Sequence, residues 1–133
     1  MILNPHYIAV IGSRKFNNYT FLEKYLNNYC STLTMPFIFI SGGAKGTDSL
    51  VEHYAKTNKH TIEIILPDWK MYQKRAGLVR NVSIVQKADT IIAFWDGYSK
   101  GTQHVIKLAR TYSKPCIIVN VLLRLQKRHS IIL

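Results

Sequence analysis

Acidic side chains are scarce in this chain of 133 residues. Seven Asp and Glu stand against eighteen Lys and Arg, which gives a formal net charge of +11 at pH 7. Such an excess of cations either predicts an anionic partner, nucleic acid included, or serves solubility as diffuse surface charge. The densest basic cluster lies in the C-terminal tail, about residues 122–133. The few acids are therefore conspicuous, and four fall in or beside predicted loops: Asp48, Asp68, Asp89 and Asp96.

Cysteine and long apolar runs are scarce as well. Cys30 and Cys116 are far apart and lack metal-ligand spacing, so they predict reduced thiols rather than a disulfide framework or a metal site. No apolar run approaches the roughly 20 residues of a membrane helix, and residues 1–10 lack the features of a signal peptide. We expect a soluble cytoplasmic protein without membrane contact, resident cofactor or metal, folded as a single domain over residues 1–133.

Short apolar runs alternate with helical periodicity along the chain. The runs, which predict buried strands, are residues 7–11, 37–40, 62–66, 90–95 and 116–121. Four helices are predicted between them; the first begins at a capping box at Thr20, and the third presents Leu78, Val79, Val82 and Val85 to the core. This alternation predicts an α/β fold, a Rossmann-like three-layer sandwich with a five-stranded, mainly parallel sheet, for which we favour the order 3-2-1-4-5.

A glycine-rich run follows the second strand and opens a helix. It reads Ser41-Gly42-Gly43-Ala44-Lys45-Gly46-Thr47-Asp48. Glycine lets the backbone approach an anion closely, and the positive end of the helix dipole attracts negative charge. The run therefore predicts a phosphate-binding loop, with Lys45 as a mobile cation. Its spacing matches neither the P-loop nor the dinucleotide-binding fingerprint, and a strand-to-helix turn without a ligand is the alternative.

Polar loops after the other strands should meet this run at one edge, because ligands of such sheets bind beyond the carboxyl ends of the strands. In the order 3-2-1-4-5 the winding reverses between strands one and four. The segments Gly12-Ser13-Arg14 and Ser99-Lys100-Gly101-Thr102 should therefore flank a pocket. The two glycine-containing helix starts would hold either one phosphate between them or two separate anionic groups.

Two arginines and two tryptophans are further candidates at this edge. Arg14 can direct two N–H donors at a phosphate. Arg80, beside Asn81 on the third helix, either reaches the pocket or pairs at the surface. Trp69 and Trp95 are candidates for stacking on a base, and Trp69 is preferred because Trp95 at a strand end fits core packing as well.

Six motifs follow one another in order over nearly the whole chain. They are IGSRKF at 11–16, SGGAKGTDSLVEHYA at 41–55, LPDW at 66–69, AGLVRN at 76–81, ADTIIAFWDG at 88–97 and SKGTQHVIKLA at 99–109. Together they resemble the SLOG superfamily and, within it, the YspA/YpsA-related group. The resemblance implies a Rossmann-like fold, a nucleotide-like ligand and, as in many related proteins, a homodimer or larger homo-oligomer.

The resemblance does not imply one reaction. The superfamily includes the Lonely Guy phosphoribohydrolases, the DNA-processing protein A family, which binds single-stranded DNA, and domains that sense NAD-derived nucleotides. Lonely Guy enzymes use a PGGxGTxxE motif, whereas here Val105 stands at the position of the glutamate. Asp48, Asp96 or Glu52 would have to supply an acid–base group instead.

The missing glutamate favours a sensor or carrier that binds a phosphorylated nucleotide or NAD-derived ligand. Two alternatives stay open. One is a nucleotide N-glycosidase that releases a base, with Asp48 and Asp96 as its catalytic residues. The other is a single-stranded nucleic-acid-binding module, for which the basic residues would have to form one stripe.

Overall fold

A five-stranded parallel sheet forms the centre of the protein, whose computed structural model describes residues 4–122. The strands are β1 (His6–Gly12), β2 (Phe37–Ser41), β3 (Ile62–Ile64), β4 (Thr90–Trp95) and β5 (Cys116–Asn120). They lie in the order β3-β2-β1-β4-β5, and every neighbouring pair is parallel. The predicted fold class and strand order are confirmed.

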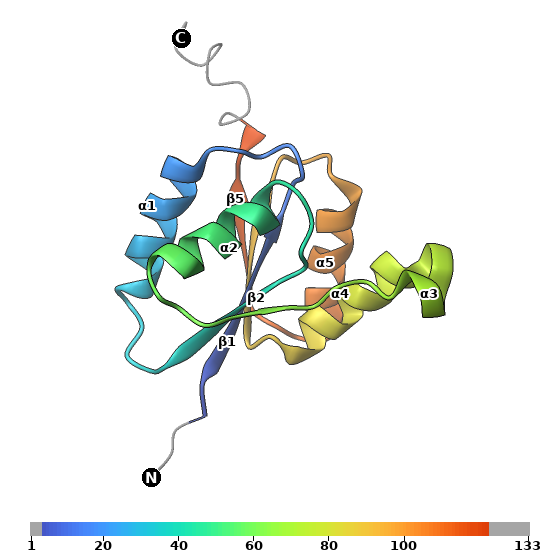
Figure 1. Ribbon diagram of the computed structural model, residues 1–133, viewed down its shortest axis with the longest axis horizontal. Helices are drawn as coiled ribbons and strands as arrows, with labels where there is room; N and C mark the ends of the chain where they lie inside the picture. The colour runs from blue at the N-terminus through green and yellow to red at the C-terminus, as the bar shows by residue number, and fades with distance from the viewer. Residues whose placement is uncertain (1–3, 123–133) are drawn as a thin grey trace, which may run out of the picture.

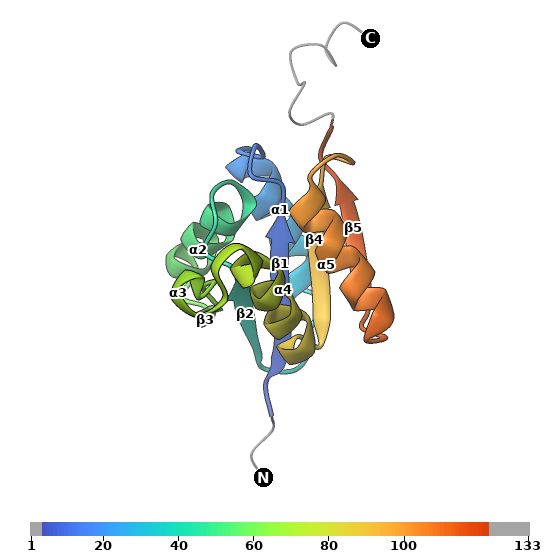
Figure 2. The same ribbon diagram turned by 90° about the vertical axis from the view of Figure 1, so that its right-hand side faces the viewer.

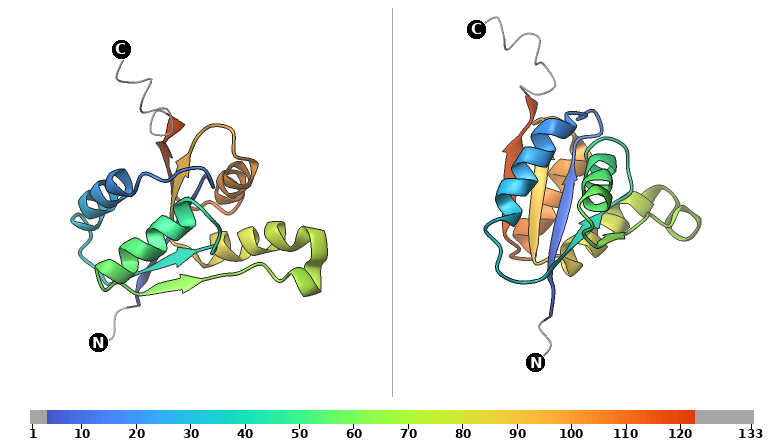
Figure 3. Two further views of the ribbon diagram at one scale, coloured as in Figure 1. Left: turned by 45° about the horizontal axis from the view of Figure 1, so that its top comes forward. Right: turned by 60° about the vertical axis from the view of Figure 1, so that its left-hand side comes forward.

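Helices cover both faces of this sheet. Figures 1 and 2 show α1 (Tyr19–Cys30) and α2 (Thr47–Thr57) on one face, and α4 (Ala76–Lys87) and α5 (Lys100–Thr111) on the other. A short arm projects beyond the sheet before α4 (Figure 3); it consists of α3 (Trp69–Tyr72) and the 3-10 turn η1 (Gln73–Arg75). No helix within residues 4–122 is long and apolar enough to cross a bilayer.

The core has two layers because successive side chains of a strand point to opposite faces. Ile8 and Val10 of β1 pack with the cluster beneath α1 and α2. Ala9 and Ile11 of the same strand belong to the cluster beneath α4 and α5. This double burial explains why the central strands are almost continuously apolar, and it holds the carboxyl ends of β1 and β4 in fixed positions.

The predicted start of α1 is wrong in detail. The helix begins at Tyr19, and its N-cap is Asn18, whose side chain accepts a hydrogen bond from the Phe21 N–H at 3.1 Å. The predicted capping box at Thr20 therefore does not form, because Asn18 supplies the cap two residues earlier.

The predicted buried face of α4 is also wrong in part. The buried residues of this helix are Ala76, Asn81, Ile84 and Val85. Leu78, which the periodicity placed in the core, is 52% exposed. The first turn of α4 extends toward the α3 arm and away from the strands (Figure 3), so it lacks a sheet to pack against.

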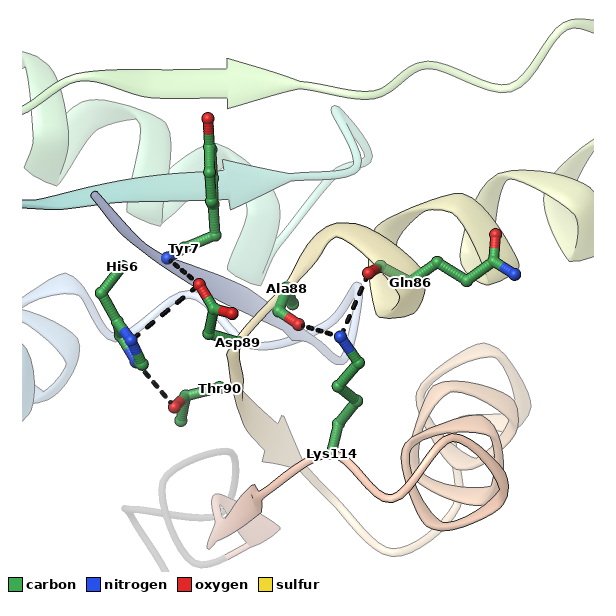
Figure 4. Close-up of polar contacts among 7 residues, drawn as sticks. All are labelled: His6, Tyr7, Gln86, Ala88, Asp89, Thr90 and Lys114. Atoms are coloured by element: carbon green, nitrogen blue, oxygen red, sulfur yellow. Dashed lines mark hydrogen bonds and ion pairs between the residues drawn. The ribbon is translucent and has the colours of Figure 1, made fainter. Parts of the chain in front are cut away.

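A polar cluster joins β1 to β4 at the amino ends of the strands, opposite the predicted ligand edge (Figure 4). The Asp89 carboxylate accepts a hydrogen bond from the Tyr7 N–H at 2.8 Å, and His6 Nε2 lies 2.9 Å from Thr90 Oγ1. Lys114 donates to two carbonyl groups at the end of α4, where a cation is favoured. Asp89 therefore has a structural role far from the carboxyl edge.

Candidate functional site

Two adjoining cavities open at the carboxyl edge of the sheet. The first cavity has a volume of about 400 Å³ and lies between the ends of β1 and β4 and the start of α5. It is lined by Ile11, Gly12, Arg14, Lys15, Gly42, Ala44, Asp48, Arg80, Asn81, Ile84, Asp96, Tyr98, Ser99, Lys100, Gly101, Thr102 and Val105. Most of the residues predicted from the sequence are therefore brought together here.

The second cavity, of about 320 Å³, adjoins the α3 arm, and we call it the Trp69 cavity. It is lined by Arg14, Gly42, Gly43, Ala44, Lys45, Pro67, Trp69, Gly77 and Arg80. Four of these residues also line the first cavity: Arg14, Gly42, Ala44 and Arg80. The two cavities therefore share a wall that carries two guanidinium groups.

A side chain from the first turn of α2 hydrogen-bonds the loop that precedes the helix. Asp48, in the first turn, is 5% exposed, and its Oδ2 accepts a hydrogen bond from the Ala44 N–H at 3.0 Å. Burial raises the pKa of Asp48 from 3.8 to about 6, although the Ala44 N–H and the charge of Arg80 act in the opposite direction. Part of the donor capacity of the glycine-rich run is thus used within the fold.

Other groups of the run contact the loop that follows β1. Thr47 donates to the Ser13 carbonyl twice, from Oγ1 at 3.0 Å and from its N–H at 3.2 Å. Gly46 has a φ of +74°, and a Cβ there would lie only 2.3 Å from the Arg14 carbonyl oxygen. The glycine is required because the two loops approach each other backbone to backbone.

Ser41 is a third internal contact of the run. Its hydroxyl donates to Glu52 at 2.8 Å and accepts from the Gly43 N–H at 3.2 Å. Four of the predicted ligand-binding residues line neither cavity: Ser13, Ser41, Gly46 and Thr47. Ser13, Ser41 and Thr47 make hydrogen bonds within and between the loops, and Gly46 allows the close approach of two loops.

The start of α5 resembles that of α2 in one respect. Within the described residues, no side chain caps either helix; the N-cap of α5 is Ser99 and that of α2 is Gly46. The Ser99 hydroxyl instead hydrogen-bonds Ser13 Oγ and the Asp96 carboxylate, both at 3.0 Å. Lys100 and Gly101 are exposed, and a Cβ on Gly101 would meet nothing within 4 Å. The first turn, whose N–H groups lack helical partners, therefore opens onto the first cavity.

Asp96, at the end of β4, fixes the turn that leads into α5. Its carboxylate accepts hydrogen bonds from the Tyr98 N–H and the Ser99 N–H, both at 2.8 Å. Burial by itself raises the pKa of Asp96, but the backbone and hydroxyl donors of this turn outweigh burial and lower it. Asp96 is therefore ionised near neutral pH, with its oxygens engaged inside the turn.

Two guanidinium groups dominate the shared wall. Arg80 donates to the Gly42 carbonyl and, through Nε, to Asn81 Oδ1 at 3.0 Å. Burial lowers the pKa of Arg80; the carboxylate of Asp48 raises it, and the nearby charge of Arg14 lowers it. Two cations that repel each other beside a single buried carboxylate favour the arrival of an anion.

The first cavity also contains residues that sequence reasoning missed. Lys15 and Tyr98 line it, and their signal was their position in the same loops as the predicted residues. Ile11, Ile84 and Val105 form an apolar wall. Val105 is 2% exposed, so apolar surface stands at the position corresponding to the glutamate of the Lonely Guy enzymes.

The two tryptophans occupy different places. Trp69 is 58% exposed and lines the Trp69 cavity. Trp95 donates through Nε1 to the Ser99 carbonyl at 3.1 Å and lines neither cavity. Over residues 4–122, no three His, Cys, Asp or Glu side chains are grouped as a metal ion would need.

Comparison with known proteins identifies relatives of this chain. Residues 7–72 match the model of the YspA, cpYpsA-related SLOG family. The Gene 61 protein of Mycobacterium phage D29 is 28% identical over 116 residues, which cover 83% of this chain and 93% of the phage protein.

Two solved structures share the fold. DNA processing protein A (DprA) from Streptococcus pneumoniae has a TM-score of 0.71 at 16% identity, covering 86% of this chain and 50% of that one. DNA processing protein A from Helicobacter pylori, described with a single-stranded DNA binding mode, has a TM-score of 0.64 at 18% identity, covering 94% of this chain and 73% of that one. This chain thus spans half the length of the Streptococcus structure, and the likeness concerns the fold.

Proposed function

This chain belongs to the YspA, cpYpsA-related SLOG family, and we propose that it binds a phosphorylated nucleotide or NAD-derived ligand as a sensor or carrier. The observation that carries the proposal is the shared wall of the two cavities. Arg14 and Arg80 both line it, and the charge of Arg14 lowers the pKa of Arg80. A phosphate in the first cavity that contacts both arginines relieves their repulsion and gains charge-assisted hydrogen bonds.

The first turn of α5 supplies the other side of this anion site. Lys100 and the open backbone at Gly101 line the same cavity as the arginines. A helix start without a side-chain cap presents N–H donors and a positive dipole end. In this arrangement the phosphate lies between Arg14 and the first turn of α5. The glycine-rich run contacts the loop that carries Arg14, because Thr47 donates to the Ser13 carbonyl and Gly46 lies against the Arg14 backbone.

Calorimetric titration tests the proposal. Ribose 5-phosphate, adenosine 5′-monophosphate and ADP-ribose are the probes, and adenosine is the unphosphorylated comparison. We expect Arg14→Ala to weaken the phosphorylated probes about tenfold, because a charge-assisted donor pair is lost, and to weaken adenosine much less. Lys56→Ala, which removes an exposed cation from the last turn of α2, is the matched control and should bind like the native protein.

Two results contradict the proposal. One is that none of the phosphorylated probes binds the native protein. The other is that Arg14→Ala and Lys56→Ala weaken binding equally, which would indicate a general charge effect rather than a site.

A nucleotide N-glycosidase is the second candidate, and Asp48 is the observation that favours it. A carboxyl group with a pKa of about 6, lining the first cavity, can hold or release a proton near neutral pH. Released base in chromatograms of the titrated samples, lost in Asp48→Asn, would establish this activity in place of simple binding.

Single-stranded nucleic acid is the third candidate. The DprA of Helicobacter pylori has a single-stranded DNA binding mode, and here four cations line the two cavities at exposed positions: Arg14, Lys15, Lys45 and Lys100. Binding along several phosphates falls steeply with salt, whereas a single pocketed phosphate responds weakly. A titration of oligonucleotide and ribose 5-phosphate between low and high salt separates the two modes.

A further inference from the structure

Trp69 lies largely in solvent although its surroundings hold it in place. It is 58% exposed. The short helix that carries it is capped by Asp68, whose carboxylate accepts a hydrogen bond from the Met71 N–H at 3.0 Å. On the side of α4, a Cβ at Gly77 would lie 4.0 Å from Trp69 Cη2. The indole is therefore positioned next to a glycine with open space before it, so its ring is available to a planar ligand.

The Trp69 cavity combines this ring with cations. Pro67, Trp69 and Gly77 form its uncharged side, and Arg14, Lys45 and Arg80 form its charged side. A planar ring entering here stacks on the indole and meets guanidinium groups, which themselves stack on rings. The lining side chains offer hydrogen-bond donors and no acceptor, so a ring that carries carbonyl oxygens matches them.

We infer that the Trp69 cavity is a subsite for the planar base of the ligand, which stacks on Trp69 while its phosphate lies in the first cavity. The inference rests on the proposed phosphate site. The shared wall makes the connection, because Arg14 and Arg80 border both cavities, and in this proposal the ribose joins the base in one cavity to the phosphate in the other. Trp69 then determines how tightly a nucleotide binds relative to its sugar phosphate alone.

The test compares inosine 5′-monophosphate, whose base carries a carbonyl oxygen, with ribose 5-phosphate, which has no base. Affinities are measured by calorimetry on the full chain. We expect Trp69→Ala to weaken the inosine nucleotide at least fivefold, as loss of base stacking does elsewhere, and to leave ribose 5-phosphate unchanged. Trp69→Phe should keep most of the nucleotide affinity because a ring remains. Met71→Ala is the matched control, because Met71 is exposed on the same short helix and lines neither cavity.

Fluorescence gives a readout that does not depend on affinity. In Trp95→Phe, the emission of Trp69 can be followed alone, because the chain has two tryptophans. Saturating inosine 5′-monophosphate should change this emission, and saturating ribose 5-phosphate should not.

The subsite is refuted, while the proposed function stands, if ribose 5-phosphate binds but Trp69→Ala leaves the nucleotide affinity unchanged or lowers both affinities equally. Unchanged emission of Trp69 at saturating nucleotide refutes it as well. If ribose 5-phosphate and the nucleotide both fail to bind the native protein, the phosphate site fails first and the base subsite fails with it.

Discussion

Two helices begin at the carboxyl edge of the sheet with a glycine-containing turn, and they differ in what occupies the turn. At the start of α2 the buried carboxylate of Asp48 accepts the Ala44 N–H. At the start of α5 the carboxylate of Asp96, which lies before the helix, accepts the Ser99 N–H and holds the preceding turn. Each acid thus accepts N–H groups of the loop before its helix, but burial raises the pKa of Asp48, whereas the donors of the turn lower the pKa of Asp96.

The glycines of the two turns differ in their surroundings. Gly46, before α2, has a positive φ and contacts backbone of the neighbouring loop, whereas Gly101, in α5, has open space around it. Gly46 is therefore needed for the fold. The small size of Gly101 is needed only if something from outside approaches it.

The largest expected effect comes from a substitution at Gly46, the N-cap of α2. Gly46→Ala places a side chain at a φ of +74° and a methyl group 2.3 Å from the Arg14 carbonyl oxygen. We expect a loss of about 3 kcal/mol or more in the free energy of unfolding, measured by urea denaturation. A loss below about 1 kcal/mol would mean that the two loops can separate without cost, and the contrast with α5 would disappear.

A smaller effect concerns the pH dependence of stability. The pKa of Asp48 is raised from 3.8 to about 6, so the native state holds this proton more tightly than the unfolded state. The stability that the protonated carboxyl contributes is complete below about pH 4 and is lost as pH rises through 6. Relative to Asp48→Asn, which cannot titrate, the native protein should lose about 2 kcal/mol of unfolding free energy between pH 4 and pH 7.

Urea denaturation of both proteins at each pH measures this difference. The other acids, including Asp96 with its lowered pKa, are shared by the two proteins, so their titration cancels in the comparison. Parallel pH profiles would show that Asp48 is ionised at no cost, and would mean that the Ala44 N–H and Arg80 fully offset the burial of its carboxylate.

The smallest effect concerns Gly101, in the first turn of α5. Gly101→Ala replaces a helical glycine that has no neighbour within 4 Å, so stability should rise by up to about 1 kcal/mol. The same methyl group crowds a phosphate that approaches the first turn, and the affinity for ribose 5-phosphate should fall severalfold. Higher thermal stability with unchanged affinity would place the phosphate elsewhere in the cavity.

The sheet could be predicted from the sequence because its signals are local. Runs such as residues 37–40 and 90–95 are apolar on both faces, and the handedness of crossovers then restricts the strand order. The α3 arm was not predicted. It is only a few residues long, and it depends on Gln73 adopting a φ of 52°, which no periodicity encodes. Asp68 after Pro67 was its one visible signal, since Asp is a good helix cap.

The role of Asp48 shows the limit of prediction at the site. The sequence places an acid in the first turn of a helix after glycines, and that pattern fits a capping acid, a ribose contact and an acid–base group alike. The hydrogen bond that Asp48 accepts depends on the path of the backbone from Gly42 to Gly46, which turns the Ala44 N–H back toward the carboxylate. That path depends on the close approach to Arg14, which is a tertiary contact.

Ser13 gives the two helix starts a common junction. This residue is fully buried, its carbonyl receives Thr47 of α2, and its hydroxyl bonds the Asp96 N–H and Ser99 at the entrance of α5. A displacement of either helix start must either move Ser13 with it or break a buried hydrogen bond. Breaking the bond costs about 1–3 kcal/mol when the partner is left unpaired. The positions of the two helix starts are thereby tied together through a single residue, by its carbonyl on one side and its hydroxyl on the other.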